Sequence, residues 1–65
     1  MNYLVACVSE FAHAFSMNTK DAFGYLYDYK AIVFLKENYD IEHTLSFYDA
    51  IEDMTAICRK NGGSL

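Results

Sequence analysis

The chain contains no proline, and only three glycines interrupt its 65 residues. Both residue types punctuate or break helices, so their scarcity favours helical structure along most of the chain. Gly24 stands alone, whereas Gly62 and Gly63 form a pair near the last residues. No linker, repeat or low-complexity stretch divides the sequence. We therefore expect a single all-α domain over residues 1–65.

The first segment predicts an amphipathic helix over about residues 2–16. Its apolar residues recur at the three- and four-residue spacing of one helix face, namely Leu4, Val5, Val8, Phe11, Ala12 and Phe15. Asn18 follows, with Asp21 three residues later, which is the pattern of an N-cap with a capping-box partner. A second helix should therefore begin at about residue 19.

The second segment, residues 19–29, carries two conflicting signals. Phe23, Tyr25, Tyr27 and Tyr29 alternate with period two, which is typical of a strand. The cap at Asn18 and the lack of a partner strand favour a helix instead. In that helix Ala22, Leu26 and Tyr29 would line one side, with Tyr25 and Tyr27 on flanking sides. A glycine inside a helix is unfavourable, so we expect another backbone to approach closely at Gly24.

Two further helices are predicted in the second half of the chain. The apolar run 31–35 does not by itself separate a strand from a helix, but its helical neighbours favour a third helix over 31–39. Residues 40–45 would then form a connecting loop. Ser46 and Asp49 predict a capping box for a fourth helix over 47–60, and Asn61-Gly62-Gly63 predicts a left-handed C-cap. The expected fold is four helices.

Charge and cysteine content restrict the classes of partner and compartment. The net charge is −4, and the five basic residues are scattered, so we expect no nucleic-acid binding. No apolar run approaches the roughly 20 residues that span a membrane. Cys7 and Cys58 sit among apolar residues, which predicts buried, reduced thiols in a cytoplasmic protein; a disulfide between them is the alternative.

No catalytic, cofactor-binding or metal-binding signature stands out. Glu10 and His13 have the Glu-x-x-His spacing of di-iron bundles, but such sites require a second pair and further glutamates. Tyr39, His43 and Thr44 could gather at the start of the last helix, where we expect His43 to bond loop backbone. Cys7 has no basic neighbour, and Cys58, although Arg59 follows it, sits among apolar residues, so we expect neither thiol to be activated. We expect no enzyme activity, no cofactor and no metal.

The aromatic content points to contact with another protein. Six tyrosines and five phenylalanines are more than the core of so short a chain can shelter. Tyrosine buries a large area at low entropic cost and keeps a polar tip, so it is favoured at interfaces. The candidate interface residues are Tyr25, Tyr27, Tyr29, Tyr39, His43 and Tyr48.

Several stretches carry a resemblance to a known family. They are Ala22 to Leu26, Phe34-Leu35 with Tyr39, His43 to Ser46, and Ala50-Ile51-Glu52-Asp53 running to Cys58 through Gly63. Through these residues the chain resembles a family of short, uncharacterised bacterial domains, with a Tyr-x-x-x-His-Thr-Leu-Ser stretch and a terminal Asn-Gly-Gly. Members look like partners of neighbouring proteins that resemble ADP-ribosyltransferase toxins. The resemblance implies an antitoxin or accessory role and supplies no catalytic residues.

Three functional hypotheses remain open from the sequence. The first is a non-catalytic interaction module that binds a protein partner. The second is a helix-turn-helix regulator that uses the second and third helices, although residues 31–39 offer only Lys36 and Asn38 for base contacts. The third is a structural homo-oligomer, in which a second copy covers the surplus aromatic surface.

Overall fold

The computed structural model describes residues 2–65, and every regular element in this range is helical. The helices are α1 (Tyr3–Ala14), α2 (Thr19–Asp28), α3 (Ala31–Glu37), α4 (Tyr39–Glu42) and α5 (Phe47–Lys60). The all-α class is confirmed. The expected count of four helices is wrong, because the third helix ends at Glu37 and an additional short helix, α4, begins at Tyr39. The expected loop over residues 40–45 is wrong in part, because its first residues belong to α4.

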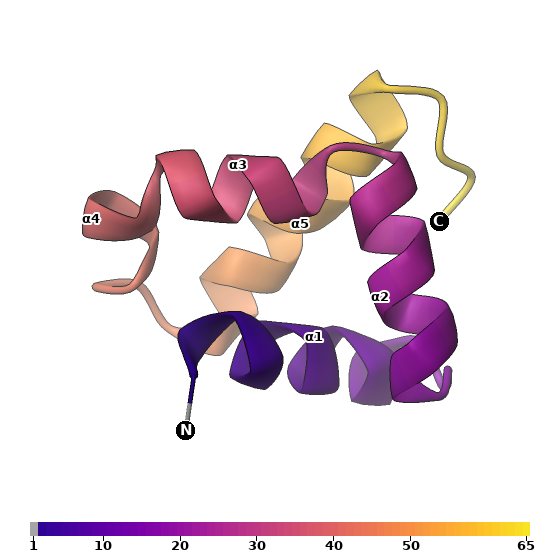
Figure 1. Cartoon of the computed structure of the whole chain (residues 1–65), viewed down its shortest axis with the longest axis horizontal. Helices are drawn as coiled ribbons and strands as arrows, with labels where there is room; N and C mark the ends of the chain where they lie inside the picture. The colour runs from indigo at the N-terminus through magenta and orange to yellow at the C-terminus, as the bar shows by residue number, and fades with distance from the viewer. Residues whose placement is uncertain (1) are drawn as a thin grey trace.

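The helices pack in two thin layers. Figure 1 shows α2 standing across the ends of α1 and α3, while α5 crosses behind them and contacts both. The short α4 continues from α3 at the end where α1 begins. The molecule measures 26 × 23 × 16 Å, so its smallest dimension spans only the two layers of helices. So thin a body leaves most of the helix surface facing outward.

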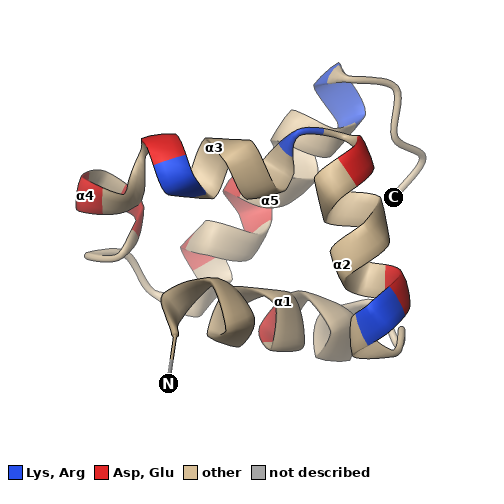
Figure 2. Cartoon of the chain, in the orientation of Figure 1, with Lys and Arg blue, Asp and Glu red and all other residues tan. Residues whose placement is uncertain are grey.

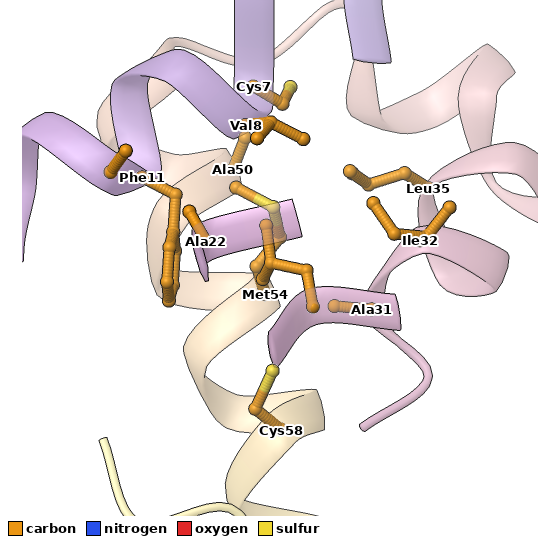
Figure 3. Packing of buried hydrophobic residues seen from close by; sticks show 12 residues of the cluster. Cys7, Val8, Phe11, Ala22, Ala31, Ile32, Leu35, Ala50, Met54 and Cys58 are labelled. Carbon is orange, nitrogen blue, oxygen red and sulfur yellow. The ribbon is translucent and has the colours of Figure 1, made fainter. Parts of the chain in front are cut away.

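The core lies where α1, α2, α3 and α5 meet. Figure 3 shows Phe11 from α1, Leu35 and Ile32 from α3, and Met54 from α5 directed into the same space. Alanines fill the positions where helices approach closely. The buried apolar residues are Cys7, Val8, Phe11, Ala12, Ala22, Leu26, Ala31, Ile32, Leu35, Ala50, Met54 and Cys58. Only one of the eleven aromatic rings, that of Phe11, belongs to this set.

The helix ends follow the predicted local signals. Asn18 Oδ1 accepts a hydrogen bond from the Asp21 N–H at 2.8 Å, and Ser46 Oγ accepts one from the Asp49 N–H at 3.2 Å. Both N-caps are therefore confirmed. The Asp21 carboxylate bonds the Asn18 side-chain amide rather than its backbone, so this capping box is incomplete.

The C-cap of α5 is also confirmed. Gly62 adopts φ +101°, the Gly62 N–H bonds the Arg59 carbonyl, and the Gly63 N–H bonds the Cys58 carbonyl at 2.7 Å. These two bonds form a Schellman motif, in which a residue of positive φ closes the helix.

The alternating aromatic residues of α2 form two ladders on different sides of the helix. Residues four apart are neighbours on a helix surface. Tyr25 and Tyr29 therefore pair, with ring centroids 4.8 Å apart, and pack against the core. Phe23 and Tyr27 pair at 6.2 Å and face outward. The helix prediction is confirmed, and the strand-like alternation arises from these interleaved pairs.

The expected close approach of another backbone at Gly24 is wrong. A Cβ added at this position would have no atom of another segment within 4 Å, so no backbone approaches it closely. The close approach occurs instead at Gly63, where an added Cβ would overlap the Tyr25 hydroxyl and lie 2.8 Å from the Cys58 carbonyl oxygen. Within residues 2–65, no helix has both the length and the apolar character needed to cross a membrane.

Candidate interaction surface

Five large apolar side chains are exposed within ten consecutive residues. They belong to α4, to the turn after it and to the first turn of α5, and we call them the α4–α5 surface: Tyr39, Ile41, Leu45, Phe47 and Tyr48. Tyr48 is the most exposed of them, at 71%. These side chains stay exposed because no other helix within residues 2–65 packs over the outer side of α4 or of the first turn of α5.

Aromatic rings from three helices meet beside this surface. Tyr3 on α1 contacts Tyr39 edge to face, with centroids 5.4 Å apart, and lies nearly parallel to Phe47 at 6.5 Å. The imidazole of His43 stacks on the Tyr39 ring at 4.5 Å. The Nδ1–H of His43 donates to the Tyr39 carbonyl oxygen at 2.6 Å, which fixes the ring in place. We call Tyr3, Tyr39, His43 and Phe47 the aromatic cluster.

An open pocket of about 520 Å³ lies within this arrangement. It is lined by Tyr3, Ala6, Ser9, Glu10, Tyr39 and Phe47. Three of these residues are aromatic, and the one charged group is the Glu10 carboxylate. We call it the aromatic pocket. Its rings come from α1, α4 and α5, so the pocket exists only when those three helices are packed together.

Glu42 is the one charged residue in the buried set, with 4% of its surface exposed. It lies at the end of α4, and its Oε1 has no hydrogen-bond partner. Burial raises the pKa of Glu42 to about 7, and the neighbouring carboxylates of Asp53 and Asp49 on α5 add to the increase. A protonated Glu42 can donate to Asp53, whereas an ionised Glu42 would be repelled by it.

Tyr3 carries a second buried oxygen without a partner. Its hydroxyl lies beside the Cys7 thiol, but no hydrogen bond of acceptable geometry joins the two groups. Burial raises the pKa of Tyr3, so the phenol stays neutral under ordinary conditions. Two buried polar groups, the Tyr3 phenol and the Glu42 carboxyl, therefore lie close to each other at this end of the molecule.

A second exposed apolar region lies between α1 and α2. It is an open groove of about 600 Å³, lined by Leu4, Val5, Val8, Ser9, Thr19, Lys20 and Phe23. Phe23 is 49% exposed there, and Tyr27 continues the same side of α2 at 60%. This groove provides a comparison for the α4–α5 surface, because its aromatic residues are equally exposed.

The chain matches a protein-family model along most of its length. The model of the family described as "Protein of unknown function (DUF3791)" matches residues 2–61, a range that includes all five helices. The chain belongs to the DUF3791 family. No curated protein and no solved structure matched it. The family description names no activity and no partner.

The candidate residues named from the sequence separate into two groups in this DUF3791 domain. Tyr27, Tyr39, His43 and Tyr48 are exposed. Tyr25 and Tyr29 are half-buried against the core, and the residues after α5 bond both of them. The role of all six at an interface stays a prediction, although the second group has less free surface to offer.

The structure also shows where the cysteines, the Glu10–His13 pair and the charged residues of α3 lie in this DUF3791 domain. Cys7 and Cys58 are buried free thiols, and burial raises the pKa of both, that of Cys58 to about 11. Glu10 and His13 are exposed, and residues 2–65 bring no three His, Cys, Asp or Glu side chains together in a metal-binding arrangement. On α3 the exposed charged side chains are Lys36 and Glu37.

Sequence reasoning missed five residues of the site. Tyr3 and Phe47 belong to the aromatic cluster, Ile41 and Leu45 belong to the α4–α5 surface, and Glu42 is buried at the end of α4. Tyr3 could have been found from its four-residue spacing to Cys7 on the apolar side of α1. No comparable signal marks Glu42, because a glutamate inside an acidic, polar stretch normally indicates an exposed position.

Proposed function

We propose that this protein is a non-catalytic interaction module that docks on another protein through the α4–α5 surface. The observation that carries the proposal is the exposure of Tyr39, Ile41, Leu45, Phe47 and Tyr48 within ten residues. Contiguous exposed apolar side chains are typical of sites that bind proteins. Tyrosine is also enriched among the residues that contribute most to binding.

The proposed partner is an ADP-ribosyltransferase-like protein, toward which the domain acts as an antitoxin or accessory subunit in the cytoplasm. The support is the sequence resemblance together with the net charge of −4. A groove that binds an anionic nucleotide cofactor presents positive potential, so an acidic domain can compete for it. Two free thiols fit a reducing compartment.

Co-expression with the neighbouring gene product, followed by affinity capture, tests the proposal. Tyr48→Ala and Tyr39→Ala remove exposed rings from the α4–α5 surface. Tyr27→Ala and Phe23→Ala are matched controls, because these rings are similarly exposed on α2. Tyr27 is among the interface candidates named from the sequence, but the proposed α4–α5 interface does not include it. We expect the first pair to weaken capture about tenfold, as for a central interface tyrosine, and the second pair to leave it unchanged.

Two results would contradict the proposal. One is failure of the wild-type domain to co-purify at low salt. The other is loss of capture by the α2 variants alone, which would move the interface to the α1–α2 groove. Circular dichroism of each variant should accompany the capture, so that lost binding is not confused with lost folding.

Self-association is the second candidate, because the same surface could be covered by another copy of the chain. A twofold dimer would place the α4–α5 surface of each copy against its equivalent. Multi-angle light scattering of the isolated domain distinguishes the two arrangements. A dimer that Tyr48→Ala converts to a monomer would favour self-association, whereas a stable wild-type monomer would leave the surface free for a different protein.

A further inference from the structure

We infer that the aromatic pocket receives a basic side chain, arginine or lysine, from the protein partner. This inference rests on the proposed function and specifies the chemistry of the partner's anchor residue. The pocket lies between α1, α4 and α5, directly beside the α4–α5 surface. A partner lying on that surface would therefore reach the pocket with a side chain.

Three aromatic rings, those of Tyr3, Tyr39 and Phe47, contribute to the lining of the pocket. Tyr3 and Tyr39 meet at an interplanar angle of 85°, while Tyr3 and Phe47 differ by only 19°. The walls consequently include both a perpendicular and a nearly parallel ring. The face of an aromatic ring attracts an ammonium or guanidinium group within about 6 Å of its centre. A volume of about 520 Å³ accommodates a long side chain.

Charge at this end of the molecule selects a basic occupant. The pocket lining includes the Glu10 carboxylate and no cation. Asp40 lies on α4, and Asp49 and Asp53 lie on the first half of α5. Figure 2 shows the acidic residues of α4 and α5 at this end, whereas Arg59 and Lys60 lie at the far end of α5. Lys36 lines an adjacent hollow, which shares Tyr3 and Tyr39 with this pocket, and is not part of the pocket lining itself.

Two buried oxygen atoms near the pocket lack hydrogen-bond partners. Among the residues that the structure describes, the buried side-chain oxygens without a hydrogen-bond partner are Tyr3 Oη and Glu42 Oε1. Tyr3 lines the pocket, and Glu42 lies close enough to influence the ionisation of Tyr3. The N–H groups of an arginine or lysine side chain could donate to these oxygens, whereas a purely apolar anchor could not.

A pair of short peptides tests the inference without the partner. One contains two arginines separated by glycine, and the other replaces each arginine with citrulline, which has a similar shape and no charge. Titration is followed by NMR through the ring protons of Tyr3, Tyr39 and Phe47. We expect the arginine peptide to shift these signals and to bind at least about fivefold more tightly than the citrulline peptide.

Two isosteric variants test whether the negative charge that attracts the arginine peptide lies at the pocket. Glu10→Gln should weaken the arginine peptide about two- to fivefold, and added salt should reduce the remaining difference. Asp28→Asn removes the same charge at the end of α2. It should affect binding of the arginine peptide only through the less negative net charge of the domain. Equal binding of the two peptides would overturn the inference, as would shifts confined to α2 and α3. Either result would leave capture through the α4–α5 surface standing.

Discussion

The hydroxyl of Tyr25 accepts a hydrogen bond from the backbone N–H of Leu65, forty residues away in the sequence, at 3.1 Å. Asn61 donates to the Tyr29 carbonyl oxygen at 3.2 Å. The residues after α5 are thus bound to the inner aromatic ladder of α2. This contact helps to explain why Tyr25 and Tyr29 are less exposed than Tyr27, Tyr39 and Tyr48.

Removing the Tyr25 hydroxyl should loosen this attachment. Tyr25→Phe keeps the ring against Phe11 and loses one hydrogen bond, so we expect the free energy of unfolding to fall by about 1 kcal/mol. Amide exchange at Leu65 should become faster. Tyr27→Phe is the control, since its exposed hydroxyl already faces water, and urea unfolding should distinguish the two. Equal stability of both variants would contradict a contribution from this bond.

Alanine substitutions at Gly24 and Gly63 should change the stability of the domain in opposite directions. Gly24→Ala places a methyl group in open space within a helix, so we expect a gain of about 0.5–1 kcal/mol. Gly63→Ala drives a methyl group onto the Tyr25 hydroxyl and the Cys58 carbonyl, so we expect a loss of about 1–3 kcal/mol. Thermal unfolding of the two variants checks both signs, and a destabilised Gly24→Ala protein would contradict the packing described for α2.

Glu42 should make the domain less stable as pH rises. Its pKa is about 7 in the folded state, against 4.5 for an unperturbed glutamate, so the folded protein retains a proton that the unfolded chain releases. The stabilising effect of this proton is complete below about pH 4.5 and is lost as pH rises through about 7. The loss amounts to at most about 3 kcal/mol.

Glu42→Gln cannot ionise and should remove this pH dependence. Urea unfolding at about pH 5 and about pH 8 should show similar stability for the variant and a decline for the wild type. Glu52→Gln, an exposed change on α5, should keep the wild-type decline. Both histidines are present in all three proteins, so their titration does not obscure the comparison. Parallel pH profiles for wild type and Glu42→Gln would show that Glu42 is not protonated in the fold.

The thiols should be unreactive until the protein unfolds. Cys7 and Cys58 have no exposed surface, and burial raises the pKa of Cys58 to about 11, so little thiolate exists at neutral pH. We expect a disulfide reagent to modify neither group in the native protein and both groups in denaturant. Rapid native modification of either cysteine would contradict its burial in the core.

The sequence by itself determined the helix boundaries that depend on neighbouring residues. Asn18, Ser46 and Gly62 mark helix ends because capping requires only hydrogen bonds within a few residues. The three-to-four-residue spacing of apolar side chains likewise indicated the buried side of α1, except that Val5 in that pattern is exposed. These features are local, so they can be recognised without knowing how the helices pack.

Only the tertiary structure decided which polar and aromatic side chains became buried and which stayed exposed. Glu42 is buried because α4 turns its carboxyl toward Asp53, a residue outside its own helix, and nothing within α4 signals that contact. Tyr25 and Tyr27 are two residues apart, yet one contacts the core and the other faces outward, because α1, α3 and the residues after α5 cover only one side of α2. Burial depends on segments distant in sequence, and local patterns do not encode their positions.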